Sequence, residues 1–380
     1  MSGAGTRFRK NKRLQEAAKA VADHTSRCRP GRHAFEYAGI GRHTAGSCGI
    51  LPAMQTASAI RPFLNFTLDE THFDGLGKRY QGKVRDVYDQ GRQAILIATD
   101  RQSAFDISWC TIPLKGQVLN QISTWWFEHI KDIAPIHVLS SPDPNVTVVK
   151  TLKMLKVEIV VRAYLTGSTG TSAWVNYSKG MRNICGNMLP DGMRKNARLA
   201  APIITPTTKS ENDELIDPAG IIERGLATKE QWKQIEDIAF ALFARGQEIA
   251  QKRGLILVDT KYEMGFDADG KLTIGDEVHT PDSSRYWVAE SYEKRLSEGL
   301  EPESLDKEFF RLWLKAQGFD YGKAKPDISD DVRLMLAIKY IDLYERMTGT
   351  DFVVPPAQDI HARIAKNVER YRVQEPRNKH

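Results

Sequence analysis

The sequence predicts a two-lobed enzyme of the α+β or mixed α/β class. Short strands dominate its first part, mixed strands and helices follow, and helices close the chain, an order typical of such folds. The 380 residues suffice for two sizeable cores. We expect a basic extension over residues 1–60, a small β-rich lobe over 61–155, a larger α/β lobe over 156–360 and a polar tail over 361–380. The space between two lobes is a usual place for a ligand.

The small lobe is predicted from short apolar runs that begin near Phe63. Gln90 and Gly91 form a turn signal between two runs of strand character. Apolar residues from Leu119 to Ile130 recur at spacings of three and four, as on one face of a helix. We therefore expect strands over residues 82–89, 93–99 and 107–112, and a helix over residues 117–133.

The larger lobe combines strands with one strongly predicted helix. Thr228 and Gln231 have the spacing of a capping box, an apolar stripe begins at Trp232, and Gly254 ends the pattern. Residues 178–228 are rich in Pro, Gly, Asn and Thr, which predicts long loops. The other expected elements are strands over 147–149, 157–165, 255–262 and 271–278, a loop at 167–170 with a short helix to Tyr177, and helices over 228–252, 304–317 and 329–348.

The positive charge of the chain is concentrated in its N-terminal segment. The chain has a formal net charge of +6, and residues 1–53 hold ten Lys and Arg against three acids, so the remainder is close to neutral. That remainder lacks the broad basic footprint of a nucleic-acid-binding domain. The segment itself is a targeting peptide, a basic arm or an extension upstream of a start at Met54. We expect it to be disordered, without a catalytic role.

The cysteines and the hydropathy favour a cytoplasmic protein. Cys28, Cys48, Cys110 and Cys185 have no metal-ligand spacing, and their scatter indicates reduced thiols rather than a disulfide framework. No stretch approaches the roughly 20 apolar residues that span a bilayer. We expect small-molecule substrates, no nucleic acid and no membrane as partners, and the sequence leaves a monomer or a homo-oligomer open.

The most informative segment is an expected hairpin around Asp269 and Gly270. An Asp-Gly pair between two strands is a strong signal for a two-residue turn. A two-residue turn there places Glu263 directly opposite Asp276, on one face of the hairpin. Lys261 lies on the same face, because strand side chains alternate with period two.

Two carboxylates this close repel each other unless a cation lies between them or one is protonated. Mg²⁺ binds carboxylate oxygens and shares its other positions with substrate phosphates. Glu263 and Asp276 are therefore candidate metal ligands, and Lys261 is a candidate partner for a phosphate. The alternative is a salt-bridged hairpin at the surface of the protein.

Two segments of the small lobe carry weaker signals. Residues 77–83 resemble the start of a phosphate-binding P-loop, but Val84 replaces the required Ser or Thr and a strand follows, so we reject that motif. Lys83 and Arg85 remain candidates for phosphate contact, or belong to an exposed charged hairpin. Residues 98–106 end a strand with polar side chains, Ser103 and Asp106 among them, which either line a site or form an ordinary turn.

Arginines of the larger lobe suggest an anion site. Arg162 interrupts a run that reads as a buried strand, and a buried arginine needs an anionic partner from the protein or from a ligand. Ser168 lies in a glycine-flanked loop at the expected start of a helix, where it caps the helix or helps to bind a phosphate. Asp282 and Arg285 follow the hairpin, and Arg285 is a second candidate anion fork. His279 is more typical of a structural histidine than of a base.

In order, these segments resemble the SAICAR synthetase (phosphoribosylaminoimidazole-succinocarboxamide synthase) family in its monofunctional form. VEIVVRAYLTGS (157–168) and LVDTKYEMG (257–265) are similar to its two signatures. GKVRDVYD, TDRQSAFD, ITPTTK and DEVHTPDSSRYW are similar to further segments of that family, as are the closing stretches DKEFFRLWL and YERMTG. Met264 stands where the signature usually has Phe.

The resemblance implies an ATP- and Mg²⁺-dependent ligase of de novo purine biosynthesis. It would join the carboxylate of 5-aminoimidazole-4-carboxylate ribonucleotide (CAIR) to the α-amine of L-aspartate, giving SAICAR, ADP and phosphate. The implied fold is a small antiparallel β lobe, similar to that of protein kinases, over a larger α/β lobe with C-terminal helices. ATP would lie between the two lobes.

The resemblance also implies roles for individual residues. Glu263 and Asp276 would bind Mg²⁺, and the segment from Met154 to Val157 would contact adenine. The implied catalytic residues are Lys261, Lys83 and Arg285. The implied substrate-binding residues are Arg162, Ser168, Arg285, Asp282, Ser103, Asp106 and Lys209. The implied ATP-binding residues are Lys83, Arg85, Met154, Lys156 and Glu263.

Two alternatives to the ligase remain. A kinase-like small-molecule phosphotransferase would use the same metal, lysines and cleft. A basic-arm nucleic-acid binder is supported by the N-terminal segment alone.

Overall fold

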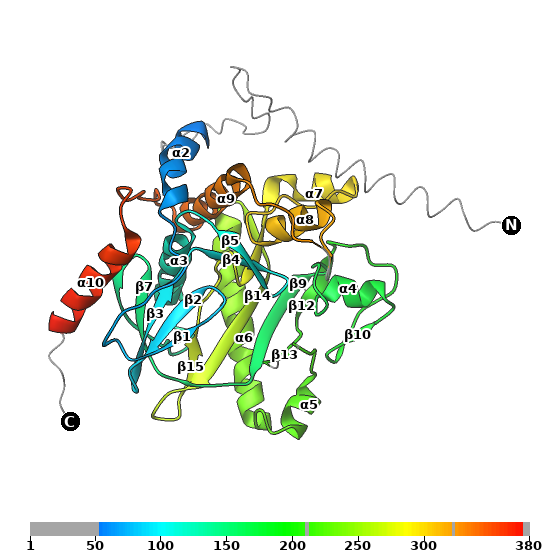
Figure 1. The fold of residues 1–380 in the computed structure, drawn as a ribbon. Helices are drawn as coiled ribbons and strands as arrows, with labels where there is room; N and C mark the ends of the chain where they lie inside the picture. The colour runs from blue at the N-terminus through cyan, green and yellow to red at the C-terminus, as the bar shows by residue number, and fades with distance from the viewer. Residues whose placement is uncertain (1–52, 210–212, 321–323, 375–380) are drawn as a thin grey trace, which may run out of the picture. The chain divides into compact units, whose positions relative to one another are not determined.

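The computed structural model describes residues 53–209, 213–320 and 324–374 (Figure 1). Of these, residues 53–311 and 328–374 belong to one compact unit, which contains all the sheets described below. Residues 312–320 and 324–327 belong to a second unit and include the end of helix α8 (Glu308–Ala316). Most of the predicted N-terminal extension lies outside the described residues.

The first sheet is antiparallel and has the strand order β1-β2-β3-β7-β6. Its strands β2 and β3 and the turn between them, at Gln90 and Gly91, confirm the prediction. Strands β1 and β6 were not predicted. The sequence does not mark β1 as a strand because it is largely exposed and carries polar side chains. The strand bounds are β1 Lys78–Gln81, β2 Arg85–Asp89, β3 Gln93–Ala98, β6 Val138–Asp143 and β7 Val146–Lys150. A separate hairpin pairs β4 (Arg101–Ala104) with β5 (Ile107–Thr111).

The C-terminal helix α10 (Ile360–Gln374) packs on the first sheet. Its apolar side chains Ile360, Ile364 and Val368 are buried in one cluster with Ile95 and Val148 of that sheet. The expectation of a polar tail over 361–380 is therefore wrong for the described part of that range. The helix is recognisable only by a narrow stripe of one apolar residue per turn. The composition of the segment is polar, so composition alone does not reveal this stripe.

The fold also begins earlier than Phe63. Helix α2 (Ala53–Ile60) and the 3-10 turn η1 (Arg61–Asn65) precede the first sheet, and Ile60 is fully buried. α2 packs against helix α9 (Asp330–Thr348). The last residues of the expected extension are thus part of the folded unit.

The second sheet is built around the long strand β14 (Leu255–Phe266). It pairs with β9 (Val157–Tyr164), whose bounds confirm the prediction, and with β15 (Leu272–Gly275) at its end. The remaining strands are β8 Lys153–Met154, β12 Arg198–Ile204, β13 Thr207–Thr208 and β16 Ser284–Val288, and β10 Asn183–Ile184 forms a small hairpin with β11 Asn187–Met188. Strands β10 to β13 lie in the range that we expected to be loop.

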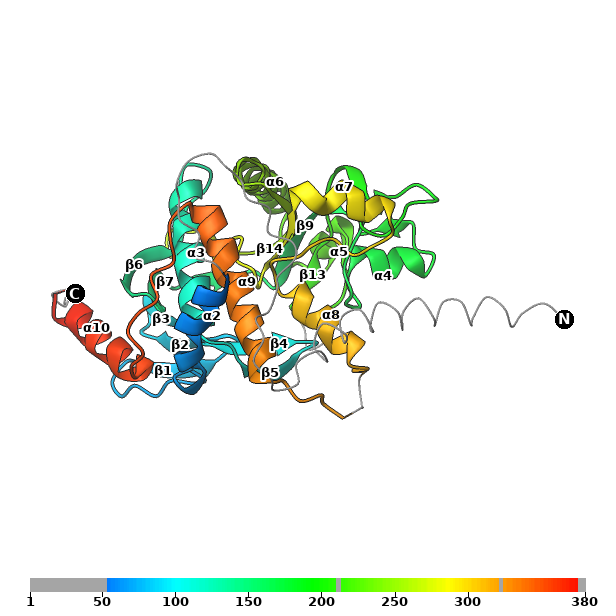
Figure 2. The same cartoon turned by 90° about the horizontal axis from the view of Figure 1, so that it is seen from above.

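Helices cover the second sheet. Helix α6 (Lys229–Lys252) runs along β14 and β9, and Figure 2 shows it on one side of them. Its capping box between Thr228 and Gln231 is present, as predicted. Helix α3 (Lys115–Ile130) contacts both β3 and α9. The shorter helices are α4 Ala173–Ser178, α5 Pro218–Glu223 and α7 Ala289–Ser297. No helix among the described residues has the length and apolar content to cross a membrane.

The register of the β14–β15 hairpin differs from the prediction by one residue. Glu263 pairs with Gly275, not with Asp276. The loop has three residues instead of two: the Asp267 amide donates to the Lys271 carbonyl at 3.1 Å, and Gly270 has φ +75°. Asp267 closes this loop, because its carboxylate accepts from the amide of Lys271 at 2.9 Å. A three-residue hairpin loop with a left-handed glycine is the common alternative to the two-residue turn.

Candidate active site

The charges of Glu263 and Asp276 interact even though the hairpin register differs from the prediction. The reason lies in the backbone of Asp276, which is outside the strand. Asp276 lies one residue past β15 and has φ +54°, a left-handed conformation. Its side-chain direction is therefore not set by the pleat. The charges of Glu263 and Asp276 still interact: burial raises the pKa of Asp276 to about 6, Arg85 opposes that shift, and Glu263 adds to it. The predicted pairing of Glu263 with Asp276 across the hairpin is therefore wrong, although the charges of the two carboxylates interact.

Lysines surround Glu263. Its carboxylate accepts from Lys261 Nζ at 2.7 Å and from Lys209 Nζ. Burial would raise the pKa of Glu263, but Lys261 and Lys209 outweigh burial and lower this pKa to about 2. Lys261 also donates to Glu158 at 2.8 Å. Burial would lower the pKa of Lys261, but Glu263 and Glu158 raise it above its usual value, so this lysine stays charged.

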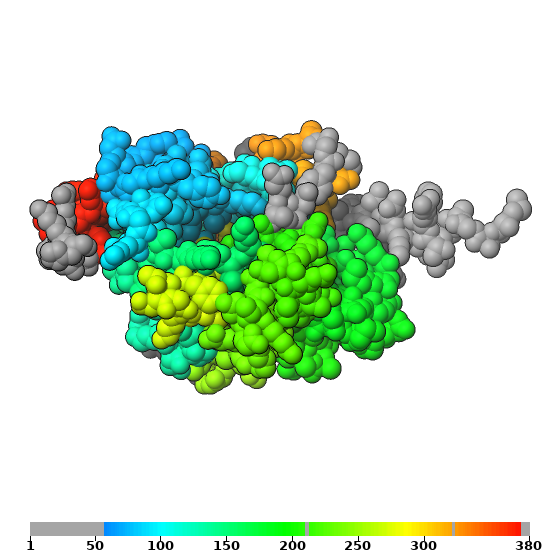
Figure 3. Space-filling model, turned by 90° about the horizontal axis from the view of Figure 1, so that it is seen from below, coloured from blue at the N-terminus to red at the C-terminus, as the bar shows by residue number. Residues whose placement is uncertain are grey.

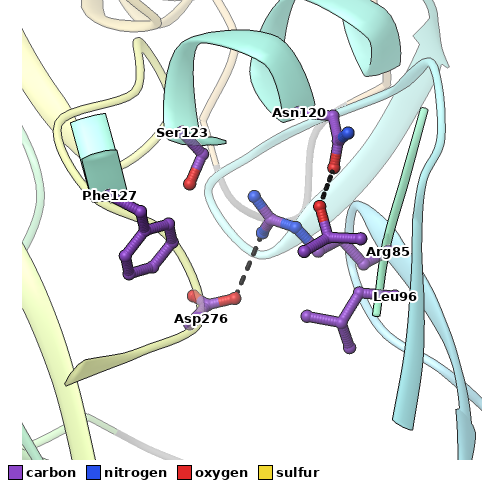
Figure 4. Close-up of a pocket in the computed structure, with 7 residues that line it drawn as sticks. Arg85, Leu96, Asn120, Ser123, Phe127 and Asp276 are labelled. Carbon is purple, nitrogen blue, oxygen red and sulfur yellow. Dashed lines mark hydrogen bonds and ion pairs between the residues drawn. The ribbon is translucent and has the colours of Figure 1, made fainter. Parts of the chain in front are cut away.

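Arg85 connects the first sheet to Asp276. It extends from β2, and its guanidinium donates to Asp276 at 3.2 Å (Figure 4). The same guanidinium donates to Glu277 at 2.5 Å. Burial would lower the pKa of Arg85, but the charges of Glu277 and Asp276 raise it. A small pocket beside this ion pair is lined by Arg85, Leu96, Asn120, Ser123, Phe127, Thr147 and Asp276. The structure thus places Arg85 against Asp276, one member of the acid pair (Glu263 and Asp276).

The donor set fits a divalent cation that shares its coordination with a substrate. Within the described residues, no group of three or more His, Cys, Asp or Glu side chains could hold a metal ion alone. Glu263 and Asp276 provide two carboxylates, with 11% and 28% of their side chains exposed. Mg²⁺ is typically held by one or two carboxylates together with substrate phosphates and water. In this structure Lys209 and Lys261 pair with Glu263, and Arg85 pairs with Asp276.

Lys83 and Asp106 form an exposed pair, with Nζ and carboxylate 2.5 Å apart. Lys83 lies in the turn between β1 and β2, whose pairing makes the segment GKRYQGK part of a hairpin. The rejection of a P-loop is confirmed, because a strand rather than a helix follows that turn.

The segment predicted to contact adenine forms an edge of the second sheet. Met154 pairs with Gly265, and the Leu155 amide donates to the Met264 carbonyl at 2.9 Å. A Cβ at Gly275 would lie 3.2 Å from Met154 Cε, so the bare glycine gives this side chain its space. The side chain of Met154 is exposed. Figure 3 shows the region of the β14–β15 turn, in yellow, at the surface of the molecule.

The segment predicted to contact adenine is joined to Lys209 by a backbone hydrogen bond. The carbonyl of Lys156 accepts from the amide of Lys209 at 3.0 Å. Lys209 in turn pairs with Glu263. The two predicted residues Lys156 and Lys209 therefore lie together at the side of the acid pair.

Arginines and carboxylates alternate along a buried ladder in the larger lobe. Arg162 donates to Asp259 at 3.3 Å and to the Thr205 hydroxyl at 2.7 Å, and burial lowers its pKa. Asp259 also pairs with Arg285, which reaches Glu308 at 3.4 Å. The anionic partner that Arg162 needs is therefore supplied by the protein. The arginine ladder consists of Arg162, Asp259, Arg285, Glu308 and Arg311.

Ser168 lies beside this ladder, not at a helix start. Helix α4 begins at Ala173 with Ser172 as its N-cap, so the predicted helix-dipole contribution at Ser168 is wrong. Ser168 instead bonds to Glu308, whose pKa falls to about 2 because Arg285 and Arg311 outweigh burial and Ser168 adds to their effect. A Cβ at Gly167 would lie 3.0 Å from Nη2 of Arg285, so the glycine lets the loop approach that arginine.

Asp282 is buried among cations. Its carboxylate accepts from Lys115 Nζ at 2.9 Å and lies 3.5 Å from Lys307 Nζ. Ser103, on β4, is 3.5 Å from the same Lys307 Nζ. Two predicted residues that are distant in sequence, Asp282 and Ser103, thus meet at a lysine that the sequence did not single out.

Sequence reasoning missed five charged residues of this region. A signal existed for Glu158, which interrupts the same β-branched run as Arg162 and shares its face of β9. No comparable signal marks the others, because their segments read as ordinary turns and helix ends. The missed residues are Lys115, Glu158, Glu277, Lys307 and Glu308.

His279 is structural, as expected. It is fully buried, with Nε2 2.5 Å from the Tyr262 hydroxyl and Trp126 edge-on at 4.5 Å between ring centroids. Burial lowers its pKa to about 3. A histidine that stays neutral and enclosed by aromatic rings is not a general base for this site.

Comparison with known proteins gives matches across both sheets. A family model described as SAICAR synthetase matches residues 78–328. A phosphoribosylaminoimidazole-succinocarboxamide synthase of Legionella pneumophila (strain Paris) is 48% identical over 309 residues, 80% of this chain and 99% of that protein. A chloroplastic enzyme of the same name from Arabidopsis thaliana is 48% identical over 320 residues, 82% of this chain and 78% of that protein. A solved SAICAR synthase of Saccharomyces cerevisiae, complexed with SAICAR, is 31% identical with TM-score 0.66, covering 75% of this chain and 99% of that one.

Proposed function

The chain belongs to the SAICAR synthetase family, and from this premise we propose that it condenses CAIR with L-aspartate, using ATP, to give SAICAR, ADP and phosphate. The observation that carries this proposal is the buried arrangement of Glu263 and Asp276 with Lys261 and Lys209 beside them. Two neighbouring acids among lysines suit a reaction in which a metal and cations gather phosphates. The reaction is a step of de novo purine biosynthesis.

The chemistry needs charge neutralisation and alignment more than covalent help. A carboxylate is a poor electrophile, so transfer of the ATP γ-phosphoryl group to the CAIR carboxylate makes an acyl phosphate with a good leaving group. The aspartate amine then attacks the acyl carbon, phosphate leaves, and the amine loses a proton. Phosphoryl transfer depends on positioning and electrostatic stabilisation by the protein. Lys261 and Lys83 are proposed to offset the negative charge on the transferred group.

Glu263 and Asp276 are the proposed ligands of Mg²⁺. The metal would neutralise phosphate charge when bound. When bound, the dication would take the place of the lysine and arginine partners of Glu263 and Asp276. Such a role explains why two acids lie together here. We expect Mn²⁺ titration in the presence of ADP, followed by electron paramagnetic resonance, to detect one or more bound ions in the wild-type protein. A Glu263→Gln variant that binds Mn²⁺ as the wild-type protein does would contradict this assignment.

Five of the remaining predicted residues fit two groups. Arg162, Arg285 and Ser168 are proposed to bind the 5′-phosphate of CAIR, since the arginine ladder carries three cations against two carboxylates. Met154 and Lys156 are proposed to contact ATP from the edge beside β14.

A direct assay tests the proposed reaction. Full-length protein is incubated with ATP, CAIR and L-aspartate, and with each omitted in turn, while ADP and the succinocarboxamide product are measured. The ligase releases ADP at full rate only with all three substrates present. ADP release that ignores aspartate would favour the kinase-like phosphotransferase instead.

We propose the cytoplasm as the location of the protein. The described cysteines Cys110 and Cys185 are free, as expected of a reducing compartment. A fluorescent fusion of the whole chain should be diffuse in the cytoplasm, and so should a fusion that lacks residues 1–53. An organellar pattern that disappears with residues 1–53 would overturn this proposal and identify the segment as a targeting peptide.

A further inference from the structure

A cluster of buried charges lies next to the acid pair and has more positive than negative members. Asp282 is at its centre, where it accepts from Lys115 at 2.9 Å and from the Tyr340 hydroxyl at 2.8 Å. Lys307 lies 3.5 Å from the same carboxylate. The three charged side chains are 0%, 3% and 13% exposed for Lys115, Asp282 and Lys307. We call Lys115, Asp282, Lys307, Ser103 and Tyr340 the lysine cluster.

The charges within the lysine cluster do not balance. Two ammonium groups face one carboxylate, whose pKa is held well below its usual range because the two lysines outweigh the effect of burial. A buried charge is costly unless it is paired and hydrogen-bonded. The surplus positive charge is therefore a ready partner for an anion from outside the protein.

Lys307 has the longer contacts of the two lysines, as far as the described residues show. An ammonium group has three N–H donors. The contacts of Lys307 Nζ with Asp282 and with Ser103 Oγ are both 3.5 Å, long for hydrogen bonds. Lys115, by contrast, donates at 2.8 Å and 2.9 Å to the Arg101 carbonyl and to Asp282. Lys307 is also the more exposed of the two lysines, so an incoming anion meets it first.

The lysine cluster is electrostatically joined to the acid pair. Asp282 contributes to the raised pKa of Arg85, the arginine that binds Asp276. Glu277, the neighbour of Asp276, acts in turn on Lys307. An anion at Lys307 would therefore lie within reach of the charges around Asp276.

We propose that Lys307, with the hydroxyl of Ser103, binds a carboxylate of L-aspartate. This inference rests on the proposed ligase function. Aspartate brings two carboxylates to the reaction, whereas the phosphate of CAIR is matched by the arginine ladder and the ATP phosphates by the metal. Asp282 is a positioning residue, because it pairs with Lys307, and Lys115 in turn holds Asp282.

The test compares Lys307→Met with Lys339→Met in steady-state assays. Lys339 is a matched control: it is partly buried, adjacent to Tyr340 in sequence, and donates to the Ser304 carbonyl at 3.2 Å. Loss of one charge-assisted hydrogen bond corresponds to about a tenfold to hundredfold loss of affinity. We expect Lys307→Met to raise the KM for aspartate by that factor, with the KM values of CAIR and ATP changed less than about threefold. Lys339→Met should leave all three values near wild type.

A second readout does not depend on turnover. Succinate has both carboxylates of aspartate but no amine, and its binding can be measured by its effect on thermal unfolding in the presence of CAIR. Succinate should stabilise the wild-type protein and Lys339→Met, and should lose this effect in Lys307→Met. Ser103→Ala removes only one hydroxyl and should weaken succinate several-fold, which tests the site even if Lys307→Met does not fold.

The outcomes separate this inference from the proposed function. An active ligase whose aspartate KM and succinate response are unchanged in Lys307→Met and Ser103→Ala overturns the inference alone. A rise in the KM for CAIR instead would assign the cluster to the nucleotide and also overturn it. Wild-type protein that forms no SAICAR would contradict the proposed function, and succinate binding that depends on Lys307 would then still establish a carboxylate site.

Discussion

At the scale of single residues, the candidate site depends on buried charged groups whose pKa values are set by their charged neighbours. Glu263 and Asp276 have opposite shifts: the pKa of Glu263 is lowered to about 2, while that of Asp276 is raised to about 6. The difference follows from their neighbours, since Glu263 has two lysines and Asp276 has one arginine that it shares with Glu277. These neighbours were only partly predictable, because Lys261 is near in sequence and Arg85 is not.

Neutralising either acid should reduce turnover sharply. Glu263→Gln and Asp276→Asn keep the shape of each side chain and remove one metal-binding charge, so we expect kcat to fall by about two to four orders of magnitude. Asp269→Asn, at the exposed tip of the same hairpin, is the control and should retain near-normal turnover. Circular dichroism should show all three variants folded. Near-normal rates in both acid variants would remove the metal assignment.

The titration of Lys307 gives a pH prediction. Burial lowers its pKa to about 8, although Asp282 opposes the shift, and Arg311, Lys115 and Glu277 are the other charges that act on it. The charged form binds an anion, so succinate affinity should be constant below pH 7 and should fall as the pH rises through 8. Succinate is preferred to aspartate as the probe because it has no amine that titrates in this range.

The matched variant for this pH profile is Lys307→Arg. Arginine remains charged throughout the accessible range, so its succinate affinity should be flat from pH 7 to 9. The same decline in both proteins would show that another group causes it.

At the scale of elements, the sequence predicted those helices and strands whose formation depends on residues within the element itself. Helix α6 was predicted because its capping box and apolar stripe lie within the helix itself. The register of the β14–β15 hairpin was not, because one extra loop residue, stabilised by the Asp267 carboxylate, changes every pairing. Strand β12 was missed because it lies in a Pro-rich segment, is largely exposed and has an irregular register with β9.

Packing of α6 on the sheet gives an element-scale prediction. A Cβ at Gly246 would lie 2.5 Å from His279 Cε1 and 2.6 Å from Leu257 Cδ2. Alanine is the better helix former, but the overlap should dominate, so Gly246→Ala should lower the free energy of unfolding by about 1–3 kcal/mol. Urea denaturation measures this change.

The control for that substitution is Gly170→Ala. No atom lies within 4 Å of a Cβ there, and Gly170 does not have a left-handed backbone. Its free energy of unfolding should change by less than about 0.5 kcal/mol. Equal effects at the two glycines would mean that the helix–sheet contact does not restrict Gly246.

At the scale of the whole compact unit, the sequence predicted an α+β or mixed α/β fold but not how the ends of the chain pack on it. α2 and α10 were assigned to flanking segments, yet both pack on the folded unit. Long-range contacts decide this. Arg363 of α10 pairs with Asp143 at 3.1 Å, across 220 residues of sequence, and no local pattern reports such a pair.

The C-terminal helix should therefore contribute to global stability. Ile364 is fully buried, so Ile364→Ala should lower the free energy of unfolding by about 2–5 kcal/mol. Val373, in the same helix, is 75% exposed, and Val373→Ala should be close to neutral. Denaturant midpoints of the two variants are the measurement. A negligible effect of Ile364→Ala would show that α10 is not part of the cooperative unit.

The most direct test of the account is a crystal structure with Mn²⁺, a non-hydrolysable ATP analogue and CAIR, with the metal located by its anomalous scattering. We predict a metal peak bonded to carboxylate oxygens of both Glu263 and Asp276 and to phosphate oxygens. A peak that touches neither acid, with Glu263 still paired to Lys209 and Asp276 to Arg85, would contradict the account.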